Sequence, residues 1–133
     1  MTHQFQTRVY YEDTDLAGIV YHANYLKFIE RARSEMVREA GISQSDLKAG
    51  QGIVFAVRRM DIDFLAPARF EDVLTVTTDL AALTGARFEL DQAVWRGQER
   101  LFQARVQVVC MGAEGRPARI PADIRQKLGA MAG

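Results

Sequence analysis

The 133-residue sequence lacks an excess of charge of either sign, with 17 Lys and Arg residues against 17 Asp and Glu residues. A chain that is neutral overall creates no field that would attract nucleic acid or an anionic membrane. We therefore expect no nucleic-acid partner. Any phosphate-bearing ligand must be held by a local cluster of cations.

The sequence also has few features of an exported or membrane protein. Its one cysteine, Cys110, cannot form an internal disulfide and lies in an apolar run, which favours a reducing compartment. No run approaches 18 apolar residues, and residues 1–5 show no basic segment leading into an apolar stretch. We expect a cytoplasmic protein without a transmembrane segment.

Repeats, low-complexity stretches and linkers are absent too, and the length allows one core of ordinary size. We therefore expect a single domain over residues 1–133. The apolar fraction of 48% and the charged fraction of 26% are typical of a globular chain that folds.

The clearest helical pattern covers residues 23–40, where apolar side chains recur at three- and four-residue steps and charged side chains fill the other face. Asn24 is the predicted N-cap, and Gly41 is predicted to end the helix. Ser43 with Asp46 resembles a capping box and predicts a short helical turn that ends before Gly50. Residues 121–131 are predicted to form a closing helix.

Alternation with a period of two predicts five strands, at residues 5–11, 53–64, 73–83, 86–95 and 101–111. The second strand changes parity, which predicts a β-bulge near Arg58 and Arg59. The last four strands are expected to form a meander of consecutive antiparallel hairpins. The order of elements predicts an α+β fold whose sheet buries one face against the long helix. Apolar residues on both parities, such as Val73 with Leu74, indicate contact with another subunit, so we expect a homo-oligomer.

The region with the strongest chemical signal is residues 11–26, which read Tyr-Glu-Asp-Thr-Asp-Leu-Ala-Gly-Ile-Val-Tyr-His-Ala-Asn-Tyr-Leu. A carboxylate in such a loop can act as general base or nucleophile, and backbone N–H groups at the following helix start can hold a developing oxyanion. Gly18 lets the backbone approach a ligand. The alternative is an acidic loop that only favours the helix N-terminus by its charge, and spacing alone does not separate the two.

This string, followed by Glu-Arg-Ala-Arg at residues 30–33, resembles the signature of the 4-hydroxybenzoyl-CoA thioesterase-like hotdog family, and within it the Tol-Pal-associated branch. Residues 59–69, with Asp72 after them, resemble the family's second strand and the turn behind it. The resemblance implies a hotdog fold, a long central helix wrapped by a five-stranded antiparallel sheet. It also implies dimers with active sites between subunits, often joined as homotetramers.

Carried over residue by residue, the resemblance places the catalytic carboxylate on Asp15. It places the N–H that polarises the thioester carbonyl on His22 or its neighbour Tyr21. The His22 side chain has two roles open to it, orienting water or the acyl group, or serving only as a spacer whose backbone matters. The residues expected to bind substrate are Gly18, Val20, Tyr21, Asn24, Tyr25 and Arg59, although the default role of Tyr25 is core packing.

The phosphates of coenzyme A need cations, and the candidates are Lys27, Arg58, Arg59 and Arg69, which the sequence does not rank. A metal site built from Asp13, Asp15 and His22 is the weaker alternative, because no second histidine lies nearby. We expect neither a metal ion nor a cofactor.

The expected activity is hydrolysis of an acyl-CoA thioester to a free acid and coenzyme A. Asp15 would either activate water or attack the carbonyl carbon. Two alternatives are a hotdog hydratase and a non-catalytic module that binds acyl-CoA or acyl carrier protein in the envelope Tol-Pal system. The sequence does not specify the acyl chain.

Overall fold

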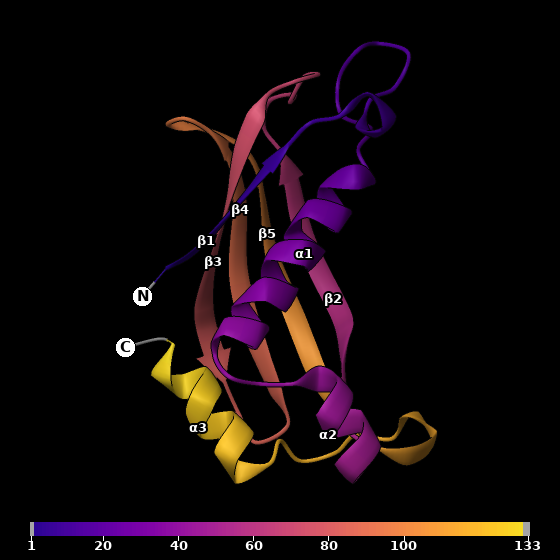
Figure 1. Cartoon of the computed structure of the whole chain (residues 1–133), viewed down its shortest axis with the longest axis vertical. Coiled ribbons are helices and arrows are strands. Elements are labelled where there is room, and N and C mark those ends of the chain that lie inside the picture. The colour runs from indigo at the N-terminus through magenta and orange to yellow at the C-terminus, as the bar shows by residue number, and fades with distance from the viewer. Residues whose placement is uncertain (1, 132–133) are drawn as a thin grey trace.

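The computed structural model, which describes residues 2–131, contains a five-stranded antiparallel sheet curved around one long helix (Figure 1). This confirms the expected α+β hotdog fold. The strands are β1 (His3–Arg8), β2 (Val54–Phe64), β3 (Val73–Leu83), β4 (Arg87–Arg96) and β5 (Glu99–Met111). The helices are α1 (Asn24–Glu39), α2 (Gln44–Gln51) and α3 (Ala122–Ala130), with 3-10 turns η1 (Tyr11–Asp13) and η2 (Ala113–Gly115).

Helix α1 buries the apolar stripe that its spacing predicts, with Phe28, Ile29 and Ala32 fully buried. The predicted N-cap is wrong by one residue, since Ala23 occupies that position and Asn24 is the first helical residue. The reason is a contact outside the helix: the Asn24 side chain donates to the Asp13 carbonyl oxygen at 2.9 Å instead of capping.

The second helix is capped as predicted, because the Ser43 hydroxyl accepts the Asp46 N–H at 3.2 Å. It runs further than expected, to Gln51, and stops at Gly52. That glycine has φ +66°, a left-handed conformation that ends helices readily. Gly41, which follows α1 with φ +85°, ends the first helix as predicted.

The order of strands in the sheet is β1-β3-β4-β5-β2. The predicted four-stranded meander is therefore correct only for β3, β4 and β5, because β2 pairs with β5 and β1 pairs with β3. Residues 65–72, which we call the crossover segment, carry the chain across the end of the sheet. The Leu65 N–H donates to Leu101 O at 2.8 Å, and the Glu71 N–H donates to Val9 O at 2.9 Å. The predicted β-bulge is confirmed by a register shift between Val57 and Arg59.

The core lies between α1 and the concave face of the sheet (Figure 1). In its aromatic part the Tyr25 ring stacks on Phe102 at a centroid distance of 5.0 Å, and Phe28 meets Tyr25 edge-on. Truncating a fully buried residue such as Phe28 to alanine is expected to cost about 3–5 kcal/mol. Among residues 2–131, no helix is both long enough and apolar enough to cross a membrane.

Candidate active site

The acidic loop, residues 12–23, lies beyond the N-terminal end of α1, at the end of the molecule opposite α2 and α3 (Figure 1). A tight turn forms its tip, where the Gly18 N–H donates to Asp15 O at 3.0 Å and the Asp15 N–H donates to Ile19 O at 2.9 Å. Gly18 has φ +80°, a conformation that favours glycine. The role that the structure gives to Gly18 is therefore to close this turn.

The Asp15 carboxylate sits exposed on this turn. Its Oδ1 accepts the Ala17 N–H at 2.9 Å, which fixes the rotamer, while Oδ2 accepts no hydrogen bond from any described residue. The neighbouring acid is engaged elsewhere, since the Asp13 carboxylate accepts the Tyr10 N–H at 2.8 Å. Asp15 is thus oriented, solvated and available to a ligand.

The backbone amides of His22 and Ala23, at the opening of α1, are also available. The Tyr21 N–H donates to Asp13 O at 2.9 Å, and the Asn24 N–H donates to Tyr21 O at 2.8 Å. The N–H groups of His22 and Ala23 find no acceptor within residues 2–131. Of the two positions expected to polarise a carbonyl, Tyr21 is therefore already hydrogen-bonded and His22 is free, at the positive end of the helix dipole.

Three residues predicted to bind substrate are buried behind the loop. Val20 is 3% exposed, and its N–H donates to Ala68 O at 2.8 Å. Tyr25 is 3% exposed, and its hydroxyl accepts the Ala68 N–H at 3.0 Å; burial raises its pKa. Asn24 is 8% exposed and holds Asp13. In this chain these side chains fix the loop to α1 and to the crossover segment.

An aromatic wall, formed by Tyr21, His22 and Phe64, stands beside the helix opening. The His22 ring lies 4.4 Å from the Tyr21 ring and 6.3 Å from the Phe64 ring, between ring centroids. Phe64 is 55% exposed although its parity in β2 matches that of inward-facing residues. Sequence reasoning missed it for that reason, since the pattern predicts a core residue.

Exposed large apolar side chains are concentrated at this end of the molecule. Apart from Val57, in the middle of β2, they come from the acidic loop, its flanks and the crossover segment: Tyr10, Tyr11, Leu16, Tyr21, Leu26, Phe64, Leu65, Phe70 and Val73. A patch of this kind marks a surface that binds a ligand or a partner.

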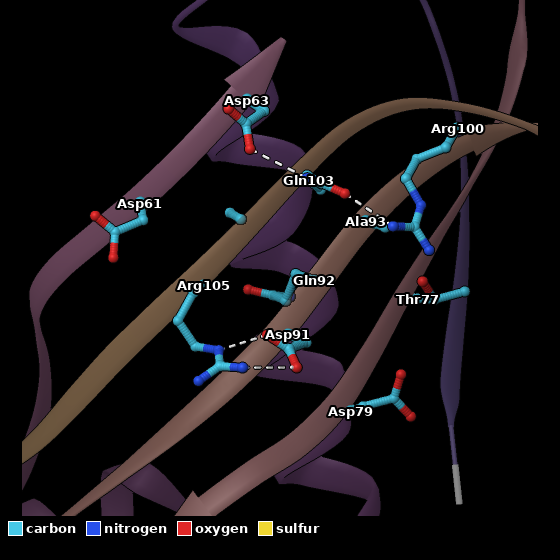
Figure 2. Close-up of a pocket in the computed structure, with 11 residues that line it drawn as sticks. Asp61, Asp63, Thr77, Asp79, Asp91, Gln92, Ala93, Arg100, Gln103 and Arg105 are labelled. Atoms are coloured by element: carbon cyan, nitrogen blue, oxygen red, sulfur yellow. Dashed lines mark hydrogen bonds and ion pairs between the residues drawn. The ribbon is translucent and has the colours of Figure 1, made fainter. Parts of the chain in front are cut away.

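Arg59 is not brought to Asp15 within the chain. It forms an ion pair at 3.4 Å with Asp61. Asp61 lies on the sheet face turned away from α1, which we call the outer face (Figure 2). Arg59 lies five residues before Phe64 on β2, about 16 Å along the strand. Arg69 is nearer to the loop, because its backbone bridges to Ile19.

A cavity of about 500 Å³ lies on the outer face, lined by side chains of the sheet (Figure 2). Its polar side chains bind one another: Arg105 pairs with Asp91 at 2.5 Å, and the Gln103 amide donates to Asp63 at 3.1 Å. The cavity includes no residue of the loop. A high density of charged side chains therefore does not identify the candidate active site in this molecule.

Comparisons with known proteins agree on one family. The chain is 39% identical to the acyl-CoA thioester hydrolase YbgC of Escherichia coli, over 91% of each chain. It is 32% identical to the 1,4-dihydroxy-2-naphthoyl-CoA hydrolase of Thermosynechococcus vestitus, over 80% of this chain and 74% of the relative. The crystal structure of a probable thioesterase from Bartonella henselae superposes with a TM-score of 0.87 at 42% identity, covering 91% of this chain and all of the other. The model of the thioesterase-like superfamily matches residues 9–128, and the chain belongs to that family.

Proposed function

We propose that this protein is an acyl-CoA thioesterase, which hydrolyses an acyl-CoA thioester to a free acid and coenzyme A. The observation that carries the proposal is that one loop holds both an exposed, oriented carboxylate, on Asp15, and the N–H groups of His22 and Ala23, which have no acceptor in the described chain. A base or nucleophile and an oxyanion site are the two requirements of acyl transfer, and both lie on one loop.

In the proposed reaction the thioester carbonyl oxygen accepts the His22 N–H, with the Ala23 N–H as a second donor. Asp15 acts on the carbonyl carbon, either by removing a proton from the attacking water or by attacking directly to give an anhydride that water then opens. The sulfur leaves as the thiol of coenzyme A. The His22 ring, held between Tyr21 and Phe64, orients the acyl group.

We further propose that the working enzyme is a homodimer or homotetramer whose sites lie between subunits. Exposed apolar side chains around the loop support this, since burial of such a patch against a second copy is favourable. An assembly also gives a role to Arg59. In its own chain Arg59 pairs with Asp61, and in an assembly it can serve a site that includes the neighbouring subunit and hold a phosphate of coenzyme A there.

The proposed location is the cytoplasm, which suits the buried free thiol of Cys110, 1% exposed. Acyl carrier protein is a second possible acyl donor, because its phosphopantetheine arm presents the same thioester as coenzyme A.

The test is a thiol-release assay on the purified protein with short aliphatic, long aliphatic and aromatic acyl-CoA substrates. We expect catalytic release of coenzyme A from at least one class. Stoichiometric retention of acyl-CoA without hydrolysis would instead support a binding module. Addition of water to enoyl-CoA without thiol release would support a hydratase.

A further inference from the structure

The acidic loop is attached to the sheet through two residues of the crossover segment. The Val20 N–H donates to Ala68 O at 2.8 Å, and Ile19 forms an antiparallel bridge with Arg69. On the other arm of the turn, the Asp15 N–H donates to Ile19 O at 2.9 Å. Backbone hydrogen bonds thus connect residues 68–69 to Asp15.

Tyr25 holds the first of these two residues. Its hydroxyl accepts the Ala68 N–H at 3.0 Å, and its ring is fixed by stacking on Phe102 in the core. The hydroxyl therefore connects the first turn of α1 to the crossover segment, immediately beside the residue that binds Val20.

The ion pair between Asp72 and Arg96 holds Arg69, the second of these two residues. The Asp72 carboxylate accepts the Arg69 N–H at 2.8 Å and the Arg96 guanidinium at 2.8 Å through the same oxygen. Arg96 also donates to Pro67 O at 3.2 Å and to Glu99 at 2.6 Å. One guanidinium thus ties both ends of the stretch 67–72 to the end of β4.

Two further features agree with these contacts. Burial raises the pKa of the Asp72 carboxyl, but the Arg69 N–H and the Arg96 guanidinium outweigh it and keep that pKa below its usual value. Glu71, although not glycine, has φ +71°. Such a conformation persists only where the surrounding contacts impose it.

We propose that Tyr25 and the Asp72–Arg96 ion pair are positioning residues for the thioesterase reaction, acting on Asp15 through the crossover segment. The inference rests on the proposed function, because it assumes that Asp15 acts on the substrate. Asp72 and Arg96 lie outside the acidic loop. They act on it only through the backbone of the crossover segment.

The experiment compares kcat and KM of thiol release for the full-length wild-type protein and for Tyr25→Phe, Asp72→Asn and Arg96→Lys. The control is Asp91→Asn, which breaks another Asp–Arg ion pair, with Arg105 on the outer face. We expect kcat to fall about tenfold in Asp72→Asn and several-fold in Tyr25→Phe, since small misplacements of a reacting group are costly. KM should change by less than about twofold in both.

Arg96→Lys keeps the charge but loses the fork that reaches Asp72 and Glu99 together, so we expect partial retention of kcat between wild type and Asp72→Asn. Hydrogen exchange supplies a readout that does not depend on activity. The Asp15 and Val20 amides should exchange faster in Tyr25→Phe and Asp72→Asn than in wild type or Asp91→Asn, at temperatures where all four remain folded.

Normal kcat in both Tyr25→Phe and Asp72→Asn, with an active wild type, would overturn the positioning role. An equal loss in Asp91→Asn, or unchanged exchange at Asp15 and Val20, would overturn it as well. An inactive wild type would overturn the proposed function itself, so the two failures are distinguishable. If Asp72→Asn does not fold, Tyr25→Phe, which deletes one hydroxyl, decides the matter.

Discussion

The acidic loop and the outer face of the sheet are both rich in charge, yet they differ in how their polar groups are satisfied. On the outer face, Arg105 pairs with Asp91 and Glu89, and Gln103 binds Asp63. At the loop, Asp15 retains an unbonded oxygen, the His22 and Ala23 amides have no acceptor in the described chain, and aromatic rings are exposed. Unsatisfied groups, and not charge density, distinguish the candidate active site.

The difference has a structural origin. Side chains on neighbouring strands lie directly opposite one another, so Asp91 faces Arg105 across β4 and β5 and the charges cancel locally. Within residues 2–131 the loop pairs with no strand and forms only isolated bridges, Thr14 with Val20 and Ile19 with Arg69. Turns therefore satisfy only part of its backbone, and the Asp15 side chain and the His22 and Ala23 amides remain available for a ligand.

The largest expected effect comes from removing the free carboxylate. Asp15→Asn should lower turnover of acyl-CoA by about 10²-fold or more, because an amide is neither a general base nor a nucleophile. The matched control is Glu12→Gln, an exposed carboxylate of the same loop, which should retain wild-type turnover. Steady-state thiol release measures both, and near-normal rates in Asp15→Asn would remove Asp15 from the mechanism.

A smaller effect is expected from the aromatic wall. His22→Ala keeps the backbone N–H but deletes the ring between Tyr21 and Phe64, so we expect kcat/KM to fall roughly tenfold through poorer orientation of the acyl group. A variant with unchanged kcat/KM would show that His22 serves through its backbone alone.

The ion pair between Asp72 and Arg96 should contribute to the pH dependence of stability. The folded-state pKa of Asp72 lies below its ordinary value, so its contribution is present above the unfolded pKa of about 3.9 and is lost as the pH falls through the folded pKa. We expect the free energy of unfolding, measured by denaturant between about pH 5 and pH 3 where carboxyl groups titrate, to fall less steeply with decreasing pH in Asp72→Asn than in wild type. Parallel curves would contradict the pairing with Arg96.

The smallest effect should come from the outer face. Arg105→Gln breaks the pairs with Asp91 and Glu89, but these are largely exposed, so the free energy of unfolding should change by less than about 1 kcal/mol. Thioesterase turnover should stay within about twofold of wild type. A large loss of activity would mean that the outer face takes part in the reaction.

The features that sequence reasoning predicted well are those set by local patterns. The apolar stripe of α1, the Ser43 cap and the bulge near Arg59 each depend on residues close together in the chain. The sheet order was predicted wrongly because nothing within residues 65–72 says which edge of the sheet β2 will join; hydrogen bonds to Val9 and Leu101, far away in sequence, decide it.

The same limit applies to the site. The motif brought Asp15, Gly18 and His22 to one loop, since all three lie within eight residues of one another. It did not separate the side chains that face solvent from those, such as Asn24 and Tyr25, that hold the loop from behind. That distinction depends on Asp13 and Ala68, whose carbonyl and amide positions are set by the folded structure.

The most direct test of the account is a crystal structure of the protein with a non-hydrolysable acyl-CoA analogue in which a ketone replaces the thioester. We predict the ketone oxygen within about 2.7–3.1 Å of the His22 or Ala23 nitrogen, with the Asp15 carboxylate facing the carbonyl carbon. A ketone bound on the outer face beside Arg105, or anywhere beyond reach of Asp15, would contradict it.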